Sequence, residues 1–441
     1  MNYNKYAEET PFSASSEEEE RTIENVLIMQ GGGSLGAFAC GVYKGLVKRK
    51  VRIDIAAGTS IGAVNAAIIA GSKSDHPEQD LEDFWMELAE SNYHVIPDIY
   101  ILDYDVNTKE YVTRKISSSS ANASVFGVPK MFIPRWLRPT TAADGWPEEL
   151  VAEGEDKISS TLPPSFLPYS YFDPRSWTYC YDHSPLAKTL DKYIDYRKLN
   201  LAKTEEKAPE VLRLIITAVD VLTAKPLIFD NTEIEIQPKH ILASAGYPIY
   251  GFPWIKVESK SADVSGNTSD IYAWDGSLLS NTPIREVLNR SPRNDKHIFV
   301  VENYPKNIRR LPSNLAEVES RAKEILFSDK NMDTIKMSKL ITRQIQLIKK
   351  LYNIFETNEA HLKLNRSDVK DIKSEYMKLI ANYGAQILSI TKIIRSEIES
   401  PTIFQNADFS PATVKELITQ GERKTIEQTV SLANISKELK V

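Results

Sequence analysis

The run Asp54–Gly71 reads DIAAGTSIGAVNAAIIAG, and the rest of the chain is organised around it. The run begins as a short apolar segment and continues as a helix of small residues. Between these parts lies Gly58-x-Ser60-x-Gly62, the pattern of a nucleophile elbow, where a sharp strand-to-helix turn exposes one serine hydroxyl. The flanking glycines leave the room that a Cβ would fill in this crowded turn. The run therefore predicts a βα unit of an α/β fold. Its serine is either a nucleophile or part of an ordinary βα turn.

A second glycine-rich segment lies before this run. Residues 25–30 predict a buried strand, and Gly31–Gly36 connects it to a helix. Backbone N–H groups at such a helix start can hold either the pyrophosphate of a dinucleotide or the oxyanion of an acyl-transfer intermediate. A dinucleotide site needs an acidic residue at the end of its second strand, where this chain has the Gly58–Gly62 elbow. The pattern favours acyl transfer. The predicted oxyanion-hole residues are Gly31, Gly32, Gly33, Ser34 and Gly36.

A nucleophilic serine needs a base, and histidine is the usual one. None of the six histidines is predicted to lie in a strand-end loop beside a carboxylate, although His183 stays open because Asp182 adjoins it. Asp275 is the better candidate, because it ends a predicted strand and can reach the sheet edge where Ser60 lies. A carboxylate with an ordinary pKa near ~3.9 is a weak base, so Asp275 must be partly desolvated to serve. The alternative is a turn residue that caps its own backbone, the commonest use of Asp-Gly.

Three motifs together resemble those of the patatin-like phospholipases. They are Gly31–Gly36, Gly58–Gly62 and Asp275–Ser277, in that order, and the resemblance covers roughly Asn25–Tyr304. It implies a three-layer α/β/α fold with a mainly parallel central sheet, a catalytic dyad of serine and aspartate, and a glycine-rich oxyanion loop. It also implies hydrolysis of fatty-acyl esters of lipids without a metal or an organic cofactor. The chain departs from the family at Leu35, where a basic residue is frequent, and at Ser277, where glycine or alanine is usual.

The chain divides into three expected parts. Residues 1–23 form an acidic tail that we expect to be disordered, residues 24–310 the patatin-like catalytic domain, and residues 311–441 a helical region. Residues 96–174 form a cap-like insertion in the catalytic domain. Within it, Met131–Arg138 is predicted either to face lipid or to join a satellite hydrophobic cluster under a long loop.

Beyond about Pro312 the apolar spacing predicts helices alone. One stripe runs through Ile341–Phe355, a second through Leu379–Ile394, and a shorter helix from about Ala412 to Ser431. Residues 297–302 are then the last strand of the sheet. We expect the C-terminal helices to pack on the domain, while homo-oligomerisation and peripheral contact with a membrane remain open uses.

Composition limits the classes of partner. The 441 residues carry a formal net charge of −6, with 42% hydrophobic and 26% charged residues, which is typical of a globular protein. The negative balance and the absence of a basic stripe with interleaved aromatics argue against nucleic acid. Cys40 and Cys180 form neither a disulfide framework nor a zinc spacing, and so indicate a reducing compartment. The N-terminal residues lack the apolar segment of a secretory signal.

The leading hypothesis is a cytoplasmic serine lipid acyl hydrolase, at most peripheral to a membrane, in which Asp275 takes the proton of Ser60. The second hypothesis is a catalytically weak lipid- or protein-binding module on the same fold, motivated by Leu35 and the large helical region. The third, a nucleotide-binding protein, is disfavoured by the elbow.

Overall fold

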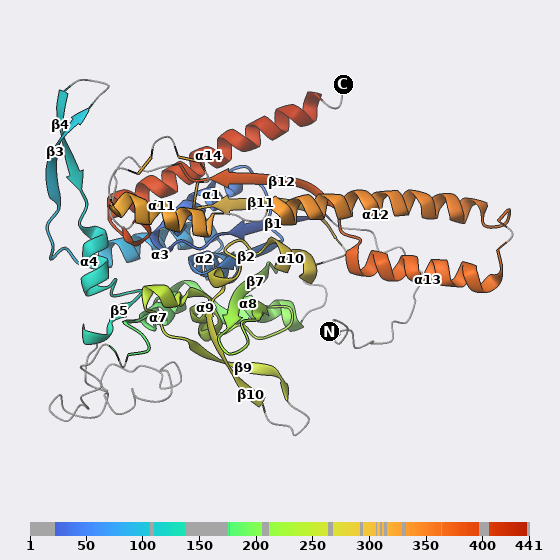
Figure 1. Cartoon of the computed structure of the whole chain (residues 1–441), viewed down its shortest axis with the longest axis horizontal. Coiled ribbons are helices and arrows are strands. Elements are labelled where there is room, and N and C mark those ends of the chain that lie inside the picture. Colours follow the sequence, from blue (N-terminus) through green and yellow to red (C-terminus); the bar gives the residue numbers. More distant parts are fainter. Residues whose placement is uncertain are drawn as a thin grey trace.

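The computed structural model describes most of the chain. The described residues are 23–105, 110–137, 175, 177–204, 211–262, 268–291, 294–305, 307–308, 311–312, 315–328, 332–362, 364–396 and 405–438. Residues 1–22 of the expected tail and residues 106–109 and 138–174 of the cap-like insertion lie outside these ranges, whereas Ile23 begins the first strand. Figure 1 shows a central sheet with helices on both of its faces and a long pair of helices, α12 (Met332–Asn358) and α13 (Arg366–Tyr383), projecting away from it.

The central sheet has eight strands in a mixed, mainly parallel arrangement. The order is β12-β11-β1-β2-β7-β10-β9, with β8 also paired to β7. The first five strands of this order are parallel to one another, while β7 meets β8 and β10, and β10 meets β9, in antiparallel fashion. The strands are β1 (Ile23–Met29), β2 (Ile55–Thr59), β7 (Arg213–Asp220), β8 (Pro226–Asp230), β9 (Ile255–Ala262), β10 (Thr268–Asp275), β11 (Asp295–Glu302) and β12 (Ile387–Ile394).

Both faces of the sheet are buried, which confirms the three-layer α/β/α prediction. In β1, Leu27 and Met29 belong to the larger hydrophobic core, whereas Val26 and Ile28 belong to a smaller core on the opposite face. Alternate side chains of a strand point to opposite faces, so a strand that is apolar at every position requires helices on both sides. The larger core contains residues of α1 (Ala37–Lys48), α2 (Ile61–Gly71), α3 (Pro77–Ser91), α7 (Pro185–Tyr193), α9 (Pro238–Ala245) and α14 (Pro411–Glu438), and the smaller core contains residues of α10 (Ile284–Arg290).

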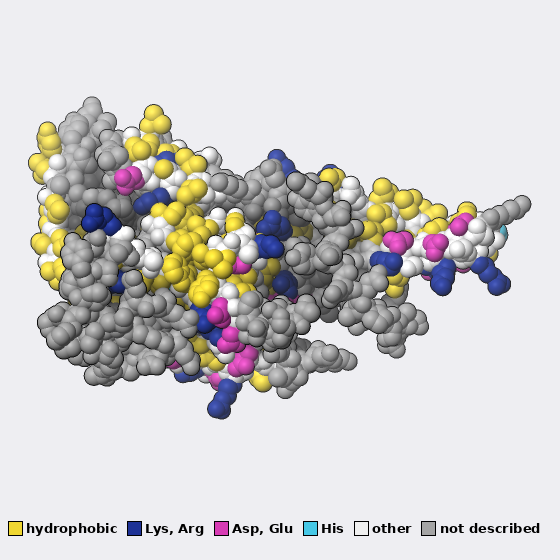
Figure 2. Space-filling view, turned by 60° about the horizontal axis from the view of Figure 1, so that its bottom comes forward, with side chains coloured by type: hydrophobic (Ala, Val, Ile, Leu, Met, Phe, Trp, Pro, Cys, Tyr) yellow, Lys and Arg dark blue, Asp and Glu magenta, His cyan; other side chains and the backbone are white. Residues whose placement is uncertain are grey.

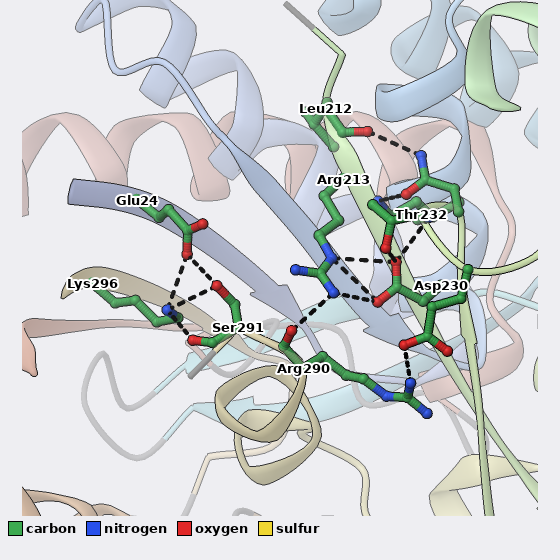
Figure 3. A network of polar contacts seen from close by, with 11 residues as sticks. Glu24, Leu212, Arg213, Asp230, Thr232, Arg290, Ser291 and Lys296 are labelled. Atoms are coloured by element: carbon green, nitrogen blue, oxygen red, sulfur yellow. Dashed lines mark hydrogen bonds and ion pairs between the residues drawn. The ribbon is translucent and has the colours of Figure 1, made fainter. Parts of the chain in front are cut away.

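The amino ends of three strands are tied together by charged side chains (Figure 3). Lys296 of β11 is completely buried, and its Nζ lies 3.0 Å from Glu24 Oε2 of β1 and 2.7 Å from the Asn294 carbonyl oxygen. Arg213 of β7 forms an ion pair of 2.7 Å with the buried Asp230. Buried charges are tolerated when they are paired and hydrogen-bonded, so this network fixes the edge of the sheet opposite to the turn at Ser60.

The prediction of helices alone beyond about Pro312 is wrong for residues 387–394. These residues form β12, which pairs in parallel with β11, so residues 297–302 are not in the last strand. Isoleucines at positions 387, 390 and 394 match a helical spacing, but the segment is rich in β-branched residues, which favour strands. The remaining predicted helices are confirmed as α12, α13 and α14, and α11 (Leu315–Phe327) precedes them.

Helix α14 packs on the catalytic domain, against α1, through backbone contact. A Cβ on Gly41 of α1 would lie 1.9 Å from the Ile418 carbonyl oxygen of α14. Conversely, a Cβ on Gly421 of α14 would lie 2.2 Å from the Phe38 carbonyl oxygen. Glycine on each helix therefore lets the two backbones touch. Among the described helices, none is both long and apolar enough to cross a bilayer.

We expect Gly41→Ala to lower the free energy of unfolding by about 1–3 kcal/mol, because the added methyl group meets backbone that cannot move without separating α1 from α14. Thermal and denaturant unfolding measure the change. Gly71→Ala is the matched control, since its methyl group would meet the Ile194 side chain, which can rotate away. An equal or smaller loss for Gly41→Ala than for Gly71→Ala would contradict the proposed backbone contact.

Candidate active site

Ser60 occupies a strained turn between β2 and α2. Its backbone has φ 59° and ψ −131°, a conformation that residues with a side chain rarely adopt. A Cβ on Gly58 would lie 2.2 Å from the Gly62 carbonyl carbon, and a Cβ on Gly62 would lie 2.2 Å from the Met29 carbonyl oxygen. The Ser60 N–H donates to Ser244 Oγ at 3.0 Å. The chain therefore makes a sharp strand-to-helix turn at Ser60, and both glycines are needed because backbone occupies the space of a Cβ.

The strand register brings Asp275 to the edge of the sheet where Ser60 lies. Thr59, at the end of β2, is paired with Thr217 of β7, and Asp275, at the end of β10, is paired with the next β7 residue, Ala218. Strand β10 runs antiparallel to β7, so it arrives from the opposite direction and stops level with the end of β2. The two residues are 215 positions apart in the sequence (275 minus 60), yet one intervening strand separates them in the sheet.

The Asp275 carboxyl group is completely buried beside Ser60. Burial raises its pKa to about 6, and interactions with the Ser60 hydroxyl and with Ser277 oppose that rise. The Ser277 N–H donates to Oδ1 at 2.8 Å, while Oδ2 has no partner of good hydrogen-bond geometry among the described residues. Catalytic hydrogen bonds are often poorly aligned in an enzyme without substrate. The carboxylate thus has one oxygen fixed by backbone and a second that can accept a proton.

The residues of the glycine-rich loop differ in whether their backbone amides are already hydrogen-bonded. The Gly31 N–H donates to Asn281 Oδ1 at 3.0 Å, so this amide is already engaged. Gly32 and Gly33 have φ values of 153° and 58°, and their amides donate to no described residue. Ser34 and Gly36 are buried, and a Cβ on Gly36 would lie 2.8 Å from the Ile61 side chain. Among the described residues the Gly32 and Gly33 amides therefore have no acceptor, whereas Gly36 serves packing.

Buried amide side chains hold this loop, and the sequence analysis did not identify them. Asn303 Nδ2 donates to the carbonyl oxygens of Gln30 and Gly31, each at 3.1 Å. Gln30 Nε2 donates to Thr282 Oγ1 at 2.8 Å. Asn281 and Thr282 follow the Asp-Gly turn within a few residues, so their position beside the site was the one available signal. Nothing in the local sequence marks Asn303.

A cavity of about 210 Å³ joins the motifs. It is bordered by Gly31, Gly32, Gly33, Ser60 and Asp275, and the rest of its wall is mainly apolar and aromatic. The cap-like insertion contributes Met131 and Phe132, while Trp136 and Leu137 of the same segment are about half exposed and Arg138 lies outside the described residues. The C-terminal region contributes Lys323, Phe327, Asn406, Ala407 and Phe409.

His183 enters the same cavity but is not hydrogen-bonded to Ser60. Its Nε2 lies 3.0 Å from the Leu242 carbonyl oxygen, and Nδ1 has no hydrogen-bond partner in the described structure. Burial lowers the pKa of the imidazole, which favours the neutral ring. A ring that donates Nε2–H to a carbonyl is held away from the serine, so the geometry gives no triad of serine, histidine and aspartate.

Within the part of the chain that the structure describes, no group of His, Cys, Asp and Glu side chains could hold a metal ion. Cys40 and Cys180 are free thiols. Ser60, Asp275 and the glycine-rich loop are the parts of the three sequence motifs that border this cavity.

Comparison with protein families matches residues 27–288 to the family described as "Patatin-like phospholipase". This range contains the glycine-rich loop, the elbow and Asp275. A search of curated proteins gives no match. Among solved structures, the chain is similar to VipD from Legionella pneumophila at 13% sequence identity and a TM-score of 0.33, over 95% of this chain and 69% of VipD.

We expect Asp275→Asn to stabilise the fold at neutral pH. The carboxyl pKa is about 6 in the folded chain, above the ordinary value near ~3.9, so the folded state holds this proton more tightly. Ionisation therefore lowers stability as the pH rises through this window. Denaturant unfolding should show a gain of about 1–3 kcal/mol at roughly pH 7.5 that shrinks toward zero near pH 4.

The control for this change is Asp83→Asn, on the exposed face of α3. A stability gain for Asp275→Asn that is the same at both pH values would show that the buried charge is not its cause.

Proposed function

Because the chain belongs to the patatin-like phospholipase family, we propose that it is a lipid acyl hydrolase that cleaves fatty-acyl esters through an acyl-Ser60 intermediate. The observation that carries this proposal is the meeting of three features in one cavity. These are a serine in a strained elbow, a buried carboxyl group with a raised pKa, and a loop with two unengaged amides.

In the first half of the proposed reaction, Ser60 Oγ attacks the ester carbonyl carbon and its proton passes to Asp275 Oδ2. The Gly32 and Gly33 amides hold the oxyanion of the tetrahedral intermediate, where such donors typically contribute on the order of 10²–10³ in rate each. The intermediate collapses, the alcohol leaves with the proton from Asp275, and the acyl group remains on Ser60.

In the second half, water attacks the acyl-Ser60 carbonyl and gives its proton to Asp275. The same amides hold the second oxyanion, and collapse releases the fatty acid and returns the proton to Ser60. A base with a pKa of about 6 is ionised at neutral pH and takes a proton more readily than an ordinary aspartate. The apolar cavity wall suits the acyl chain.

The alternative, a binding module with a weak site, gains no support from Leu35. This side chain is buried in the larger hydrophobic core and does not line the cavity. Its position leaves the two loop amides unaffected, so the absence of a basic residue there gives no reason to expect an impaired site.

Ser60→Ala should abolish ester hydrolysis, by at least about a thousandfold in kcat, because the acyl-enzyme cannot form. Turnover of p-nitrophenyl esters and of phospholipid vesicles measures the loss, and a fluorophosphonate probe should label Ser60 in the wild type. Ser91→Ala, at the end of α3, is the control. Activity that survives Ser60→Ala, or a label on another residue, would overturn the proposal.

The pH dependence of kcat/KM should report the Asp275 carboxyl. We expect a loss of about tenfold per pH unit below roughly pH 6 and a plateau above it, because the free enzyme loses its base when Asp275 is protonated. A profile that stays flat down to about pH 4.5 would mean that a carboxyl group with an ordinary pKa, or none, is involved.

A further inference from the structure

Helix α11 exposes several apolar residues to solvent, while it buries Phe327 and Glu324, whose carboxylate pairs with Arg321 at 3.0 Å. Val318, Ile325 and Leu326 are 50%, 55% and 52% exposed. The inward side of the helix carries Lys323, which is half-buried, and the buried Phe327, and both line the cavity. A helix on the surface of a globular protein normally places charged residues outward and apolar residues inward. Helix α11 departs from this rule in part, and it places the Lys323 side chain in the wall of an apolar cavity.

Lys323 is the one lysine or arginine among the residues that the structure places around the cavity. Its Nζ lies 5.5 Å from the centre of the Tyr250 ring. Tyr250 in turn contacts the Tyr247 ring at 5.1 Å, and Tyr247 contacts Phe327 at 5.4 Å. The Tyr250 ring thus contacts the ammonium group, and the Tyr247 and Phe327 rings continue the aromatic wall from it.

A separate aromatic cluster forms another part of the cavity wall. Phe132 lies 5.4 Å from both Tyr181 and Phe252, measured between ring centres, and Tyr181 lies 5.7 Å from Phe252. This cluster carries no cationic side chain and suits an acyl chain. The cavity therefore has an apolar part and a part with a positive charge, as an amphiphile with an anionic group requires.

Helix α11 is also tied to the glycine-rich loop. Asn281 Oδ1 accepts the Gly31 N–H, and its Nδ2 donates to the Phe327 carbonyl oxygen at 3.3 Å. Lys323 lies about one helical turn before this anchor. A substrate group held by Lys323 is thereby kept in a fixed relation to the loop that faces Ser60.

We propose that Lys323 forms an anion subsite that recognises the phosphate of a phosphate-bearing acyl ester, which makes it a specificity-determining residue for the hydrolysis. The proposal rests on the proposed function, because the ligand is taken to be the ester that Ser60 attacks. A compact ammonium group binds phosphate as a point charge, and an apolar surrounding strengthens that attraction. The interactions that shift the pKa of Asp275 come from burial, Ser60 and Ser277, so Lys323 is assigned to the substrate and not to the base.

The first test measures binding without turnover. In the Ser60→Ala background, calorimetry compares a short-chain monoacylglycerol phosphate with the matching monoacylglycerol, each below its micelle concentration. Adding Lys323→Met should weaken binding of the phosphate-bearing lipid by about tenfold more than binding of the neutral lipid. Lys323→Arg should keep the preference, and Lys336→Met, exposed on α12, should change neither affinity.

Equal weakening of both lipids, no weakening, or no binding of either lipid would overturn the subsite. Inorganic phosphate is titrated in parallel. If it binds as tightly as the lipid phosphate and competes with it, the site serves free phosphate and the assignment to a lipid headgroup falls. Weak or absent binding of inorganic phosphate supports the headgroup.

The second test measures turnover of a phospholipid and of a diacylglycerol with the same acyl chains. Lys323→Met should lower the ratio of the two kcat/KM values about tenfold, whereas an unchanged ratio would overturn the subsite. If the wild type cleaves neither lipid but the binding preference holds, the proposed hydrolase activity fails and the subsite stands. The two proposals can therefore fail separately.

Discussion

The structure depends on the close approach of three backbone segments beneath Ser60. The end of β1, the end of β2 and the first turn of α2 meet closely here. A Cβ on Gly58 would overlap Gly62, and a Cβ on Gly62 would overlap the Met29 carbonyl group. This contact forces the chain through a positive φ at Ser60, a conformation that costs on the order of 1–3 kcal/mol and persists only when its surroundings determine it. Two features of the surroundings determine it here. Strand β2 is buried on both faces, and the Ser60 amide is hydrogen-bonded. The Ser60 N–H is held by Ser244 Oγ, which itself donates to the Thr217 carbonyl oxygen at 2.7 Å.

The C-terminal region takes part in the same construction, although it lies outside the family match. The Asn406 carbonyl oxygen lies 2.2 Å from the position that a Cβ of Gly33 would take, so Gly33 is required by contact as well as by its φ of 58°. The Phe409 ring stacks on Trp85, whose indole N–H donates to Asn65 Oδ1, and Asn65 Nδ2 donates to the Gly36 carbonyl oxygen. Two sets of contacts thus connect the segment before α14 with Gly33 and Gly36 of the glycine-rich loop. The packing of α14 on α1 holds the segment that makes these contacts.

The sequence predicts this site wherever the determinant is local. Glycine spacing fixes the elbow at Ser60 and the loop at residues 31–36, and the end of a strand before Asp-Gly marks Asp275. Features that depend on contact between residues far apart in the chain could not be predicted from the sequence. Engagement of the Gly31 amide by Asn281 links residues 250 positions apart, and the inward direction of Lys323 runs against the usual polarity of a surface helix. Residues 387–394 are a third example. Their isoleucine spacing fits a helix, and they form a strand because they pair with β11.

The carboxyl groups of Glu24 and Asp275, at opposite edges of the sheet, have pKa values that shift in opposite directions. At the amino edge, burial pushes the pKa of Glu24 upward, but Lys296 and hydrogen bonds from Asn294 and Ser291 outweigh it and leave the pKa lowered (Figure 3). At the carboxyl edge, burial acts on Asp275 with hydrogen bonds alone against it, and the pKa rises to about 6. A paired carboxylate is stable and unreactive, whereas one without a cation among its interactions binds a proton readily.

A lysine at the carboxyl edge must therefore stay far enough from Asp275 to leave the Asp275 carboxylate unpaired. Lys323, across the cavity on α11, meets this condition, because it is not among the groups that shift the Asp275 pKa. Figure 2 shows a band of hydrophobic side chains across the middle of one face of the molecule, with charged groups beside it. Lys323 lines a mainly apolar cavity, which is where the phosphate group of the proposed substrate would lie.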